Sequence, residues 1–294
     1  MDKQQMAPQH GINTQQFIKQ ITARFEMACL HFGHGTDNAW DEACWLLETL
    51  LKRHGATEIG AELPVPQSCL EEANAIVQAR ITTRKPLAYL LGEAWFCGLA
   101  FHVNEHVLVP RSPIAELIAN EFQPMIKKAP KRILDLCTGS GCIGIACAMA
   151  FPDSQVVLSD ISEDALEIAR RNIERYGLGD RVAAVRSDLF EEINGRFDLV
   201  VTNPPYVGET EYESLPEEFF REPALGLLTG HDGLDIPLRI LKQCRRYLED
   251  TGWLVLEVGN SDEALANACI ELPLIWLDFE QGGSGVCAIS AADL

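Results

Sequence analysis

Basic residues are scarce in this sequence of 294 residues: 24 Lys and Arg stand against 43 Asp and Glu, giving a formal net charge of −19. Most of the imbalance lies in residues 101–294, which hold 32 acids and 16 bases, whereas residues 1–100 hold 11 acids and 8 bases. A nucleic-acid groove needs clustered Lys and Arg to neutralise phosphates. The composition therefore argues against direct nucleic-acid recognition and favours attraction of a basic protein partner.

Long apolar runs are also missing. No run reaches the roughly 18 residues needed to span a bilayer, and residues 1–16 lack the apolar segment of a signal peptide. The ten cysteines include no Cys-x-x-Cys pair, and reduced thiols are expected in a chain of this length without a secretion signal. We therefore expect a cytoplasmic protein without membrane association and without a metal site, and the sequence leaves the oligomeric state open.

The apolar pattern divides the chain into three expected regions. Residues 1–94 repeat apolar side chains at helical spacing and predict a small helical N-terminal domain for substrate docking. Residues 95–109 alternate apolar and polar side chains around Asn104-Glu105, which predicts a β-hairpin linker. Residues 110–294 alternate short β runs with helices, which is typical of an α/β domain with a parallel sheet covered on both faces. In this last region we expect strands at 133–136, 156–159, 182–186, 198–202, 254–258, 275–279 and 286–290, and helices at 142–150, 163–176, 234–248 and 263–270.

A glycine-rich loop follows the first of these strands. Gly139, Gly141 and Gly144 match G-x-G-x-x-G between a strand and a helix, and Asp160 stands 21 residues after Gly139 at the end of the next strand. Such glycines let a cofactor approach the backbone, and the carboxylate can accept hydrogen bonds from ribose hydroxyls. Asp188, after the third strand, is placed where an adenine would lie. Tight strand–helix packing without a ligand is the alternative, and the two aspartates argue against it.

The tetrapeptide Asn203-Pro204-Pro205-Tyr206 follows the fourth strand. The Asn203 Oδ1 atom and the Pro204 carbonyl can each accept one N–H of a planar NH2 group. The prolines fix the turn, and the Tyr206 ring can stack on a flat amide or aminopurine. A turn that only stops the strand is the plain alternative. Because a dehydrogenase has no use for this motif, we predict S-adenosylmethionine as the cofactor, with a nitrogen as the methyl acceptor and no general base.

These motifs, in this order, resemble the glutamine amide (N5) methyltransferases. One branch of that family modifies peptide-chain release factors, and a sister branch modifies the large-subunit ribosomal protein uL3. The resemblance runs from about residue 84 to the C-terminus and includes PLAYLLG at 86–92, VLVPR at 107–111 and NPPY at 203–206. In release-factor enzymes the Pro-Arg at the end of the second motif is typically followed by a stretch like Asp-Thr-Glu, whereas this chain has RSPIAE at 111–116. That segment, LPEE at 215–218 and GHDGLD at 230–235 look more like the ribosomal-protein branch.

The resemblance implies a seven-stranded, Rossmann-like class I methyltransferase sheet whose last strand is antiparallel. It also implies methylation of a glutamine side-chain amide in the basic protein uL3. The alternatives are a release-factor glutamine methyltransferase and, more distantly, an adenine amino (N6) methyltransferase acting on nucleic acid, which would need a basic groove.

The expected catalytic residues are the four of the tetrapeptide, Asn203, Pro204, Pro205 and Tyr206. The expected cofactor contacts are Arg111, Asp135, Cys137, Thr138, Gly139, Ser140, Gly141, Asp160, Ile161, Asp188, Leu189 and Asn203. Arg111 and Glu116 are equally explained as charges at a helix end. Six glutamates follow the tetrapeptide, and only Arg221 opposes their charge. We expect these acids to attract the basic substrate. They are Glu209, Glu211, Glu213, Glu217, Glu218 and Glu222.

Overall fold

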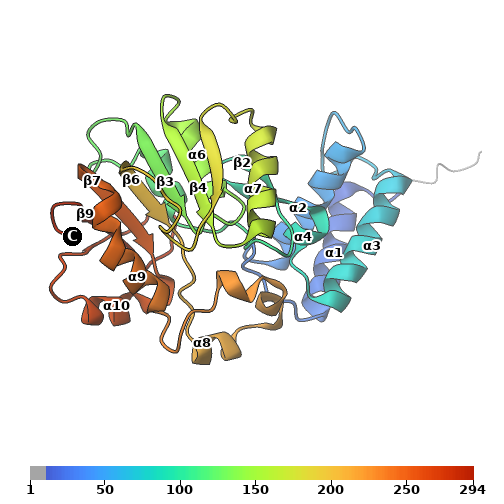
Figure 1. Cartoon of the computed structure of the whole chain (residues 1–294). Coiled ribbons are helices and arrows are strands. Elements are labelled where there is room, and N and C mark those ends of the chain that lie inside the picture. The colour runs from blue at the N-terminus through green and yellow to red at the C-terminus, as the bar shows by residue number, and fades with distance from the viewer. Residues whose placement is uncertain (1–10) are drawn as a thin grey trace, which may run out of the picture. The chain divides into compact units, whose positions relative to one another are not determined.

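The computed structural model describes residues 11–294, which divide into two compact units at Leu91 and Gly92 (Figure 1). The first unit is helical, as the apolar spacing predicted. Its helices are α1 (Thr14–Met27), α2 (Ala39–Arg53), α3 (Gln67–Thr83) and α4 (Leu87–Leu91). Asparagines begin two of them: Asn13 Oδ1 accepts a hydrogen bond from the Gln16 N–H at 2.8 Å, and Asn38 Oδ1 accepts one from the Asp41 N–H at 2.9 Å. These caps satisfy backbone donors that a helix start leaves open.

The second unit opens with a hairpin of β1 (Glu93–Phe96) and β2 (Leu99–His102). Its turn is Cys97-Gly98, where φ is 50° and 72°, the positive values that a type I′ hairpin turn needs at both central positions. The expected turn at Asn104-Glu105 is therefore wrong. There the Asn104 side chain accepts a hydrogen bond from the His106 N–H at 3.0 Å, which makes a local turn outside the hairpin.

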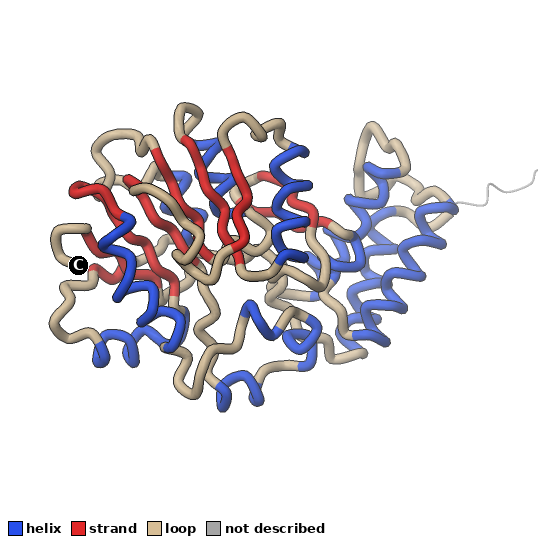
Figure 2. The backbone as a smooth tube through the Cα atoms, in the orientation of Figure 1, coloured by secondary structure: helices blue, strands red, loops and turns tan. Residues whose placement is uncertain are grey.

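A seven-stranded sheet forms the centre of the second unit, with strand order β5-β4-β3-β6-β7-β9-β8 (Figure 2). Strands β3 to β7 are parallel, and β9 is antiparallel to both of its neighbours. The strands are β3 (Arg132–Leu136), β4 (Gln155–Asp160), β5 (Val182–Arg186), β6 (Phe197–Thr202), β7 (Leu248–Glu257), β8 (Ile275–Trp276) and β9 (Val286–Ser290). The predicted α/β class and the antiparallel last strand are confirmed.

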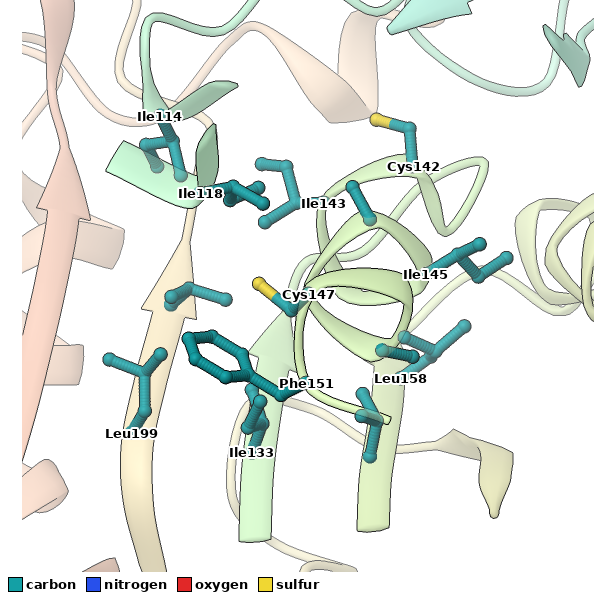
Figure 3. Close-up of a cluster of buried hydrophobic side chains, with 14 of the residues drawn as sticks. Ile114, Ile118, Ile133, Cys142, Ile143, Ile145, Cys147, Phe151, Leu158 and Leu199 are labelled. Carbon is teal, nitrogen blue, oxygen red and sulfur yellow. The ribbon is translucent and has the colours of Figure 1, made fainter. Parts of the chain in front are cut away.

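Helices cover both faces of this sheet. They are α5 (Ile114–Ala119), α6 (Cys142–Ala150), α7 (Glu163–Arg175), α9 (Asp235–Cys244) and α10 (Asp262–Ala268), whereas α8 (Glu209–Ser214) buries no residue and belongs to the segment between β6 and α9. Successive residues of β3 point to opposite faces: Ile133 belongs to the apolar cluster with α5, α6 and α7, and Leu134 to the cluster with α9 and α10. Figure 3 shows the first cluster, in which Phe151 lies beside Ile133 and Leu199 of the strands, and Ile143 of α6 lies beside Ile118 of α5.

Three differences from the expected elements concern the C-terminal half. The helix after residue 234 ends at Cys244 and passes through a short 3₁₀ turn, Arg245–Tyr247, into β7, which begins six residues earlier than expected. The strand expected at 275–279 has only two residues, both exposed at the sheet edge. The segment between β6 and α9 holds α8 and the 3₁₀ turns Glu217–Arg221 and Ala224–Gly226, which apolar spacing did not indicate.

Candidate active site

A cavity of about 570 Å³ opens at the carboxyl ends of the parallel strands. It lies where β3 is flanked by β4 on one side and β6 on the other, so that the strand order reverses at this point. Open α/β sheets bind their ligands at such a reversal, and the volume is typical of a site for a small molecule or cofactor. The cavity lies within the second unit and is lined by the loops after β3 to β6, by residues 106–112 and by Glu257 at the end of β7.

The glycine-rich loop is shaped by Asp135 near the end of β3. Its Oδ2 atom accepts hydrogen bonds from the Thr138 hydroxyl at 2.5 Å and from the Gly144 N–H at 2.8 Å. The carboxyl group is buried, and burial raises its pKa to about 7. Asp135 does not line the cavity. The structure therefore places this residue beneath the loop, where it holds the loop's shape.

The glycines of the motif have different surroundings. Gly139 has a φ of 54°, and a Cβ there would meet no other described atom within 4 Å, so backbone conformation is what requires glycine. A Cβ at Gly144 would lie 2.2 Å from Leu158 Cδ2, so this position serves close packing of α6 on β4. Gly141 has a φ of 82° and precedes α6, and like Asp135 it does not line the cavity.

Asp160, the last residue of β4, faces the cavity beside this loop. Its Oδ2 accepts a hydrogen bond from the Gly139 N–H and its Oδ1 accepts one from the Ser162 N–H, both at 2.9 Å. Burial raises the pKa of Asp160, and these backbone donors oppose the rise. Because a carboxylate oxygen accepts more than one hydrogen bond, each oxygen can still receive a ligand hydroxyl.

Asp188, in the loop after β5, also lines the cavity. Its Oδ1 accepts a hydrogen bond from Arg239 Nη2 at 2.9 Å, and Arg239 of α9 also lines the cavity. Sequence reasoning missed Arg239, because no local motif marks an arginine that meets Asp188 from 51 positions away. The remaining expected cofactor residues that line the cavity are Cys137, Thr138, Ser140, Ile161 and Leu189.

The tetrapeptide lies at the end of β6, on the same cavity. Asn203, Pro205 and Tyr206 line it, whereas Pro204 is buried behind them. No hydrogen bond within residues 11–294 engages the Asn203 side chain, so its amide remains available to a ligand. Directly before it, the Thr202 hydroxyl donates to the Leu136 carbonyl at 2.9 Å and joins β6 to β3.

Tyr206 is held by the last residue of β7 and by residues directly after this strand. Its hydroxyl donates to Glu257 Oε1 at 3.3 Å, and its carbonyl accepts a hydrogen bond from the Ser261 hydroxyl at 2.9 Å. A Cβ at Gly259 would lie 2.6 Å from Tyr206 Cε2, so the backbone packs directly against the ring. Burial raises the pKa of Tyr206, which keeps the phenol protonated and able to donate.

Arg111 lines the cavity but is engaged by a carboxylate. Its guanidinium donates to Glu222 Oε1 at 2.8 Å and to Glu222 Oε2 at 2.5 Å, and it lies 5.4 Å from the centre of the Phe219 ring. Glu116 lies elsewhere: its carboxylate accepts backbone hydrogen bonds from Glu280 and Gln281 at 3.1 Å each. The structure therefore gives Glu116 a role in holding the loop before β9.

The six glutamates after the tetrapeptide do not form one exposed surface. Glu218 and Glu222 are buried, so their expected contribution to an exposed acidic surface is wrong. A buried glutamate usually has a partner, and for Glu222 that partner is Arg111. Glu209, Glu213 and Glu217 are exposed, and Glu211 accepts a hydrogen bond from Asn260 at 3.0 Å.

Together, the strand order, the glycine loop against Asp160 and the Asn-Pro-Pro-Tyr turn define an S-adenosylmethionine-dependent methyltransferase. The family model "Methyltransferase small domain" matches residues 115–233. Two curated proteins named ribosomal protein uL3 glutamine methyltransferase are each 44% identical to this chain. The protein from Francisella tularensis aligns over 90% of this chain and 86% of its own length, and the one from Xanthomonas campestris over 94% and 91%. The chain belongs to the ribosomal protein uL3 glutamine methyltransferase family.

A solved structure supports the fold. The hMettl16 catalytic domain superimposes with a TM-score of 0.55 over 77% of this chain and 83% of its own length, at 16% sequence identity. At that identity the likeness concerns the fold alone.

Proposed function

We propose that this protein transfers the methyl group of S-adenosylmethionine to the side-chain amide nitrogen of a glutamine in ribosomal protein uL3. One observation carries the proposal: the Asn203 amide, suited to an NH2 group, shares a single cavity with the loop at Gly139 and the Asp160 carboxylate. The two relatives named for this activity support the choice of uL3 as the substrate.

The cofactor fits the donor set of this cavity. Asp160 would accept hydrogen bonds from the ribose hydroxyls, because each of its oxygens has spare acceptor capacity beside one backbone bond. The backbone near Gly139 would lie against the cofactor, since an added side chain there would point into open space. Asp188, oriented by Arg239, would contact the adenine. When bound, S-adenosylmethionine supplies an electrophilic methyl group on a sulfonium.

An amide nitrogen is a weak nucleophile because its lone pair is delocalised into the carbonyl, so the protein must orient and polarise it. Asn203 Oδ1 and the Pro204 carbonyl would accept the two amide hydrogens and direct the nitrogen toward the methyl group. These acceptors also stabilise the positive charge that develops on nitrogen. Proximity alone can contribute up to roughly 7–11 kcal/mol. Tyr206 would flank the amide plane, and the surplus proton can leave to water after transfer.

The partner in this proposal is a basic protein. The net charge of −16 over residues 101–294 suits a partner rich in Lys and Arg and opposes phosphate binding. We place the reaction in the cytoplasm, where ribosomal proteins meet the ribosome. Within residues 11–294, no helix is long and apolar enough to cross a membrane.

Incubation with purified substrates tests the proposal. The protein and S-adenosylmethionine would be combined with uL3 or with a release factor, and the modified residue located by mass spectrometry. We expect one methyl group on a glutamine of uL3 and none on the release factor. Methylation of the release factor alone would assign the chain's activity to the sister branch, and methylated RNA with unmodified protein would refute the acceptor assignment.

A further inference from the structure

A buried carboxylate, Glu257, joins three segments of the active site. It is the last residue of β7, and it lines the cavity although it is only 4% exposed. Its Oε2 accepts a hydrogen bond from the Ser112 hydroxyl at 2.5 Å, and its Oε1 accepts one from the Tyr206 hydroxyl at 3.3 Å. The bond from Ser112 has the short length typical of a hydroxyl that donates to an ionised carboxylate, whereas the bond from Tyr206 is longer. Glu257 therefore bridges the segment before α5 to the aromatic residue of the tetrapeptide.

Ser112 is itself fixed. Its hydroxyl oxygen accepts a hydrogen bond from the Ile114 N–H at 3.1 Å, at the start of α5, and the residue is buried. The hydroxyl proton is thereby directed to Glu257. Ser112 thus fixes the Glu257 carboxylate through its Oε2 atom. The Oε1 atom can then hold a more mobile partner.

Tyr206 is that partner. The backbone at Gly259 packs against its ring, and the Glu257 carboxylate holds its hydroxyl. The Gly259 backbone limits tilting of the ring, and the hydrogen bond to Glu257 limits sliding of the ring within its own plane. The segment from 257 to 261 thus determines where the Tyr206 ring lies relative to Asn203.

We infer that Glu257, anchored by Ser112, is a positioning residue for methyl transfer, which acts by fixing the Tyr206 ring beside the acceptor amide. The inference rests on the proposed function, because it concerns the same acceptor site. The carboxylate touches Tyr206 and takes no proton from the substrate. A misplacement of about 1 Å at a reacting centre can cost roughly a hundredfold in rate, so a contact that sets one ring position has a measurable effect on turnover.

The charge of Glu257 gives this role a dependence on pH. Burial raises its pKa to about 7, and hydrogen bonds from Ser112 and Tyr206 and the charge of Arg111 oppose the rise. Arg111 and Ser112 face it from the segment before α5, and Tyr206 from the turn after β6. A protonated Glu257 is neutral and has an O–H donor in place of one acceptor, so it loses the stronger charge-assisted bonds from the two hydroxyls. The hold on Tyr206 is therefore strongest well above pH 7 and weakens as the pH falls through about 7.

A double-mutant cycle separates this role from general support of the fold. We expect Glu257→Gln to lower kcat by about tenfold to a hundredfold with unchanged affinity for S-adenosylhomocysteine. Tyr206→Phe removes the same contact from the other side, so the double variant should be no slower than the slower single variant. Ser112→Ala should lower kcat in the same direction by a smaller factor. Glu249→Gln is the matched control, because Glu249 is exposed on the same strand.

Additive losses in the cycle would overturn the inference, as would a loss of S-adenosylhomocysteine affinity that matches the loss of kcat. The acid limb of the wild-type pH profile near pH 7 should disappear in Glu257→Gln, and its persistence would also overturn the inference.

One readout does not depend on methyl transfer at all. With fluorotyrosine at position 206, the fluorine NMR signal should shift and broaden in Glu257→Gln and Ser112→Ala, and stay unchanged in Glu249→Gln. An unchanged signal in Glu257→Gln would refute the positioning role even in an active enzyme. A changed signal in a protein that leaves uL3 unmodified would keep the positioning role and refute the proposed function.

Discussion

The backbone N–H of Gly139 donates to Asp160 Oδ2 at 2.9 Å, across the ends of two adjacent parallel strands. One carboxylate thus shapes the glycine loop and presents its remaining lone pairs to the cavity. Asp160→Ala should weaken binding of S-adenosylmethionine and S-adenosylhomocysteine by about 1.5–3 kcal/mol, the value of a hydrogen bond to a charged group. Calorimetry measures this, and Asp160→Asn, which keeps one carbonyl oxygen, should lose less. Tight NADH binding without S-adenosylhomocysteine binding would contradict the cofactor assignment.

Asn203→Ala tests the acceptor contact. Turnover should fall roughly a hundredfold or more, the usual cost of removing one preorganised transition-state contact. The affinity for S-adenosylhomocysteine should change little, because Asn203 would act on the substrate amide. Single-turnover kinetics with a glutamine peptide measure the chemical step. Normal turnover of the variant would mean that another group accepts the amide hydrogens.

The exposed glutamates near the tetrapeptide should act on encounter with the substrate. Replacing Glu209, Glu213 and Glu217 together by Gln should lower kcat/KM for intact uL3 and flatten its salt dependence, because steering by surface charge is screened over about 8–10 Å. Turnover of a short neutral glutamine peptide serves as the control and should stay constant. Equal losses on both substrates would show that the segment shapes the cavity instead. Glu218 and Glu222 are left unchanged, because both are buried.

Stability should depend on pH through Asp135. Burial raises the pKa of this carboxyl from 3.8 to about 7, so between these values the folded state keeps a proton that the unfolded state has lost. The contribution of Asp135 to the free energy of unfolding therefore falls as pH rises from about 4 to about 7 and is constant above. Relative to Asp135→Asn, the wild type should lose stability over this interval in denaturant titrations. Parallel curves for the two proteins would contradict the pKa assignment.

The parts of the site that the sequence predicted are those carried by local motifs. Gly139 and Asn203 follow strands of a parallel sheet and Asp160 ends one, and the carboxyl ends of such strands meet at one edge. Glu257, Ser112 and Arg239 were missed, because each is a common residue type whose partner lies far along the chain. Their roles come from side-chain packing between segments, which has no signature in spacing.

The burial of charged side chains was harder to predict from the sequence than the local motifs. The pattern of glutamates after Tyr206 indicated a solvated surface, yet Glu222 pairs with Arg111 across 111 positions. The hairpin turn was misplaced for a different reason: Asn-Glu at 104–105 is polar, whereas Cys97-Gly98 supplies the positive φ that the turn requires. The backbone conformation at Cys97-Gly98, and not the polarity of residues 104–105, determines where the hairpin turns.

Mass spectrometry of ribosomal proteins from cells that lack this enzyme tests the central claim most directly. Protein uL3 should lose one methyl group from a single glutamine, and return of the gene, but not of its Asn203→Ala variant, should restore it. Release factors should keep their modification throughout. An unchanged uL3 in the deleted cells would contradict the account.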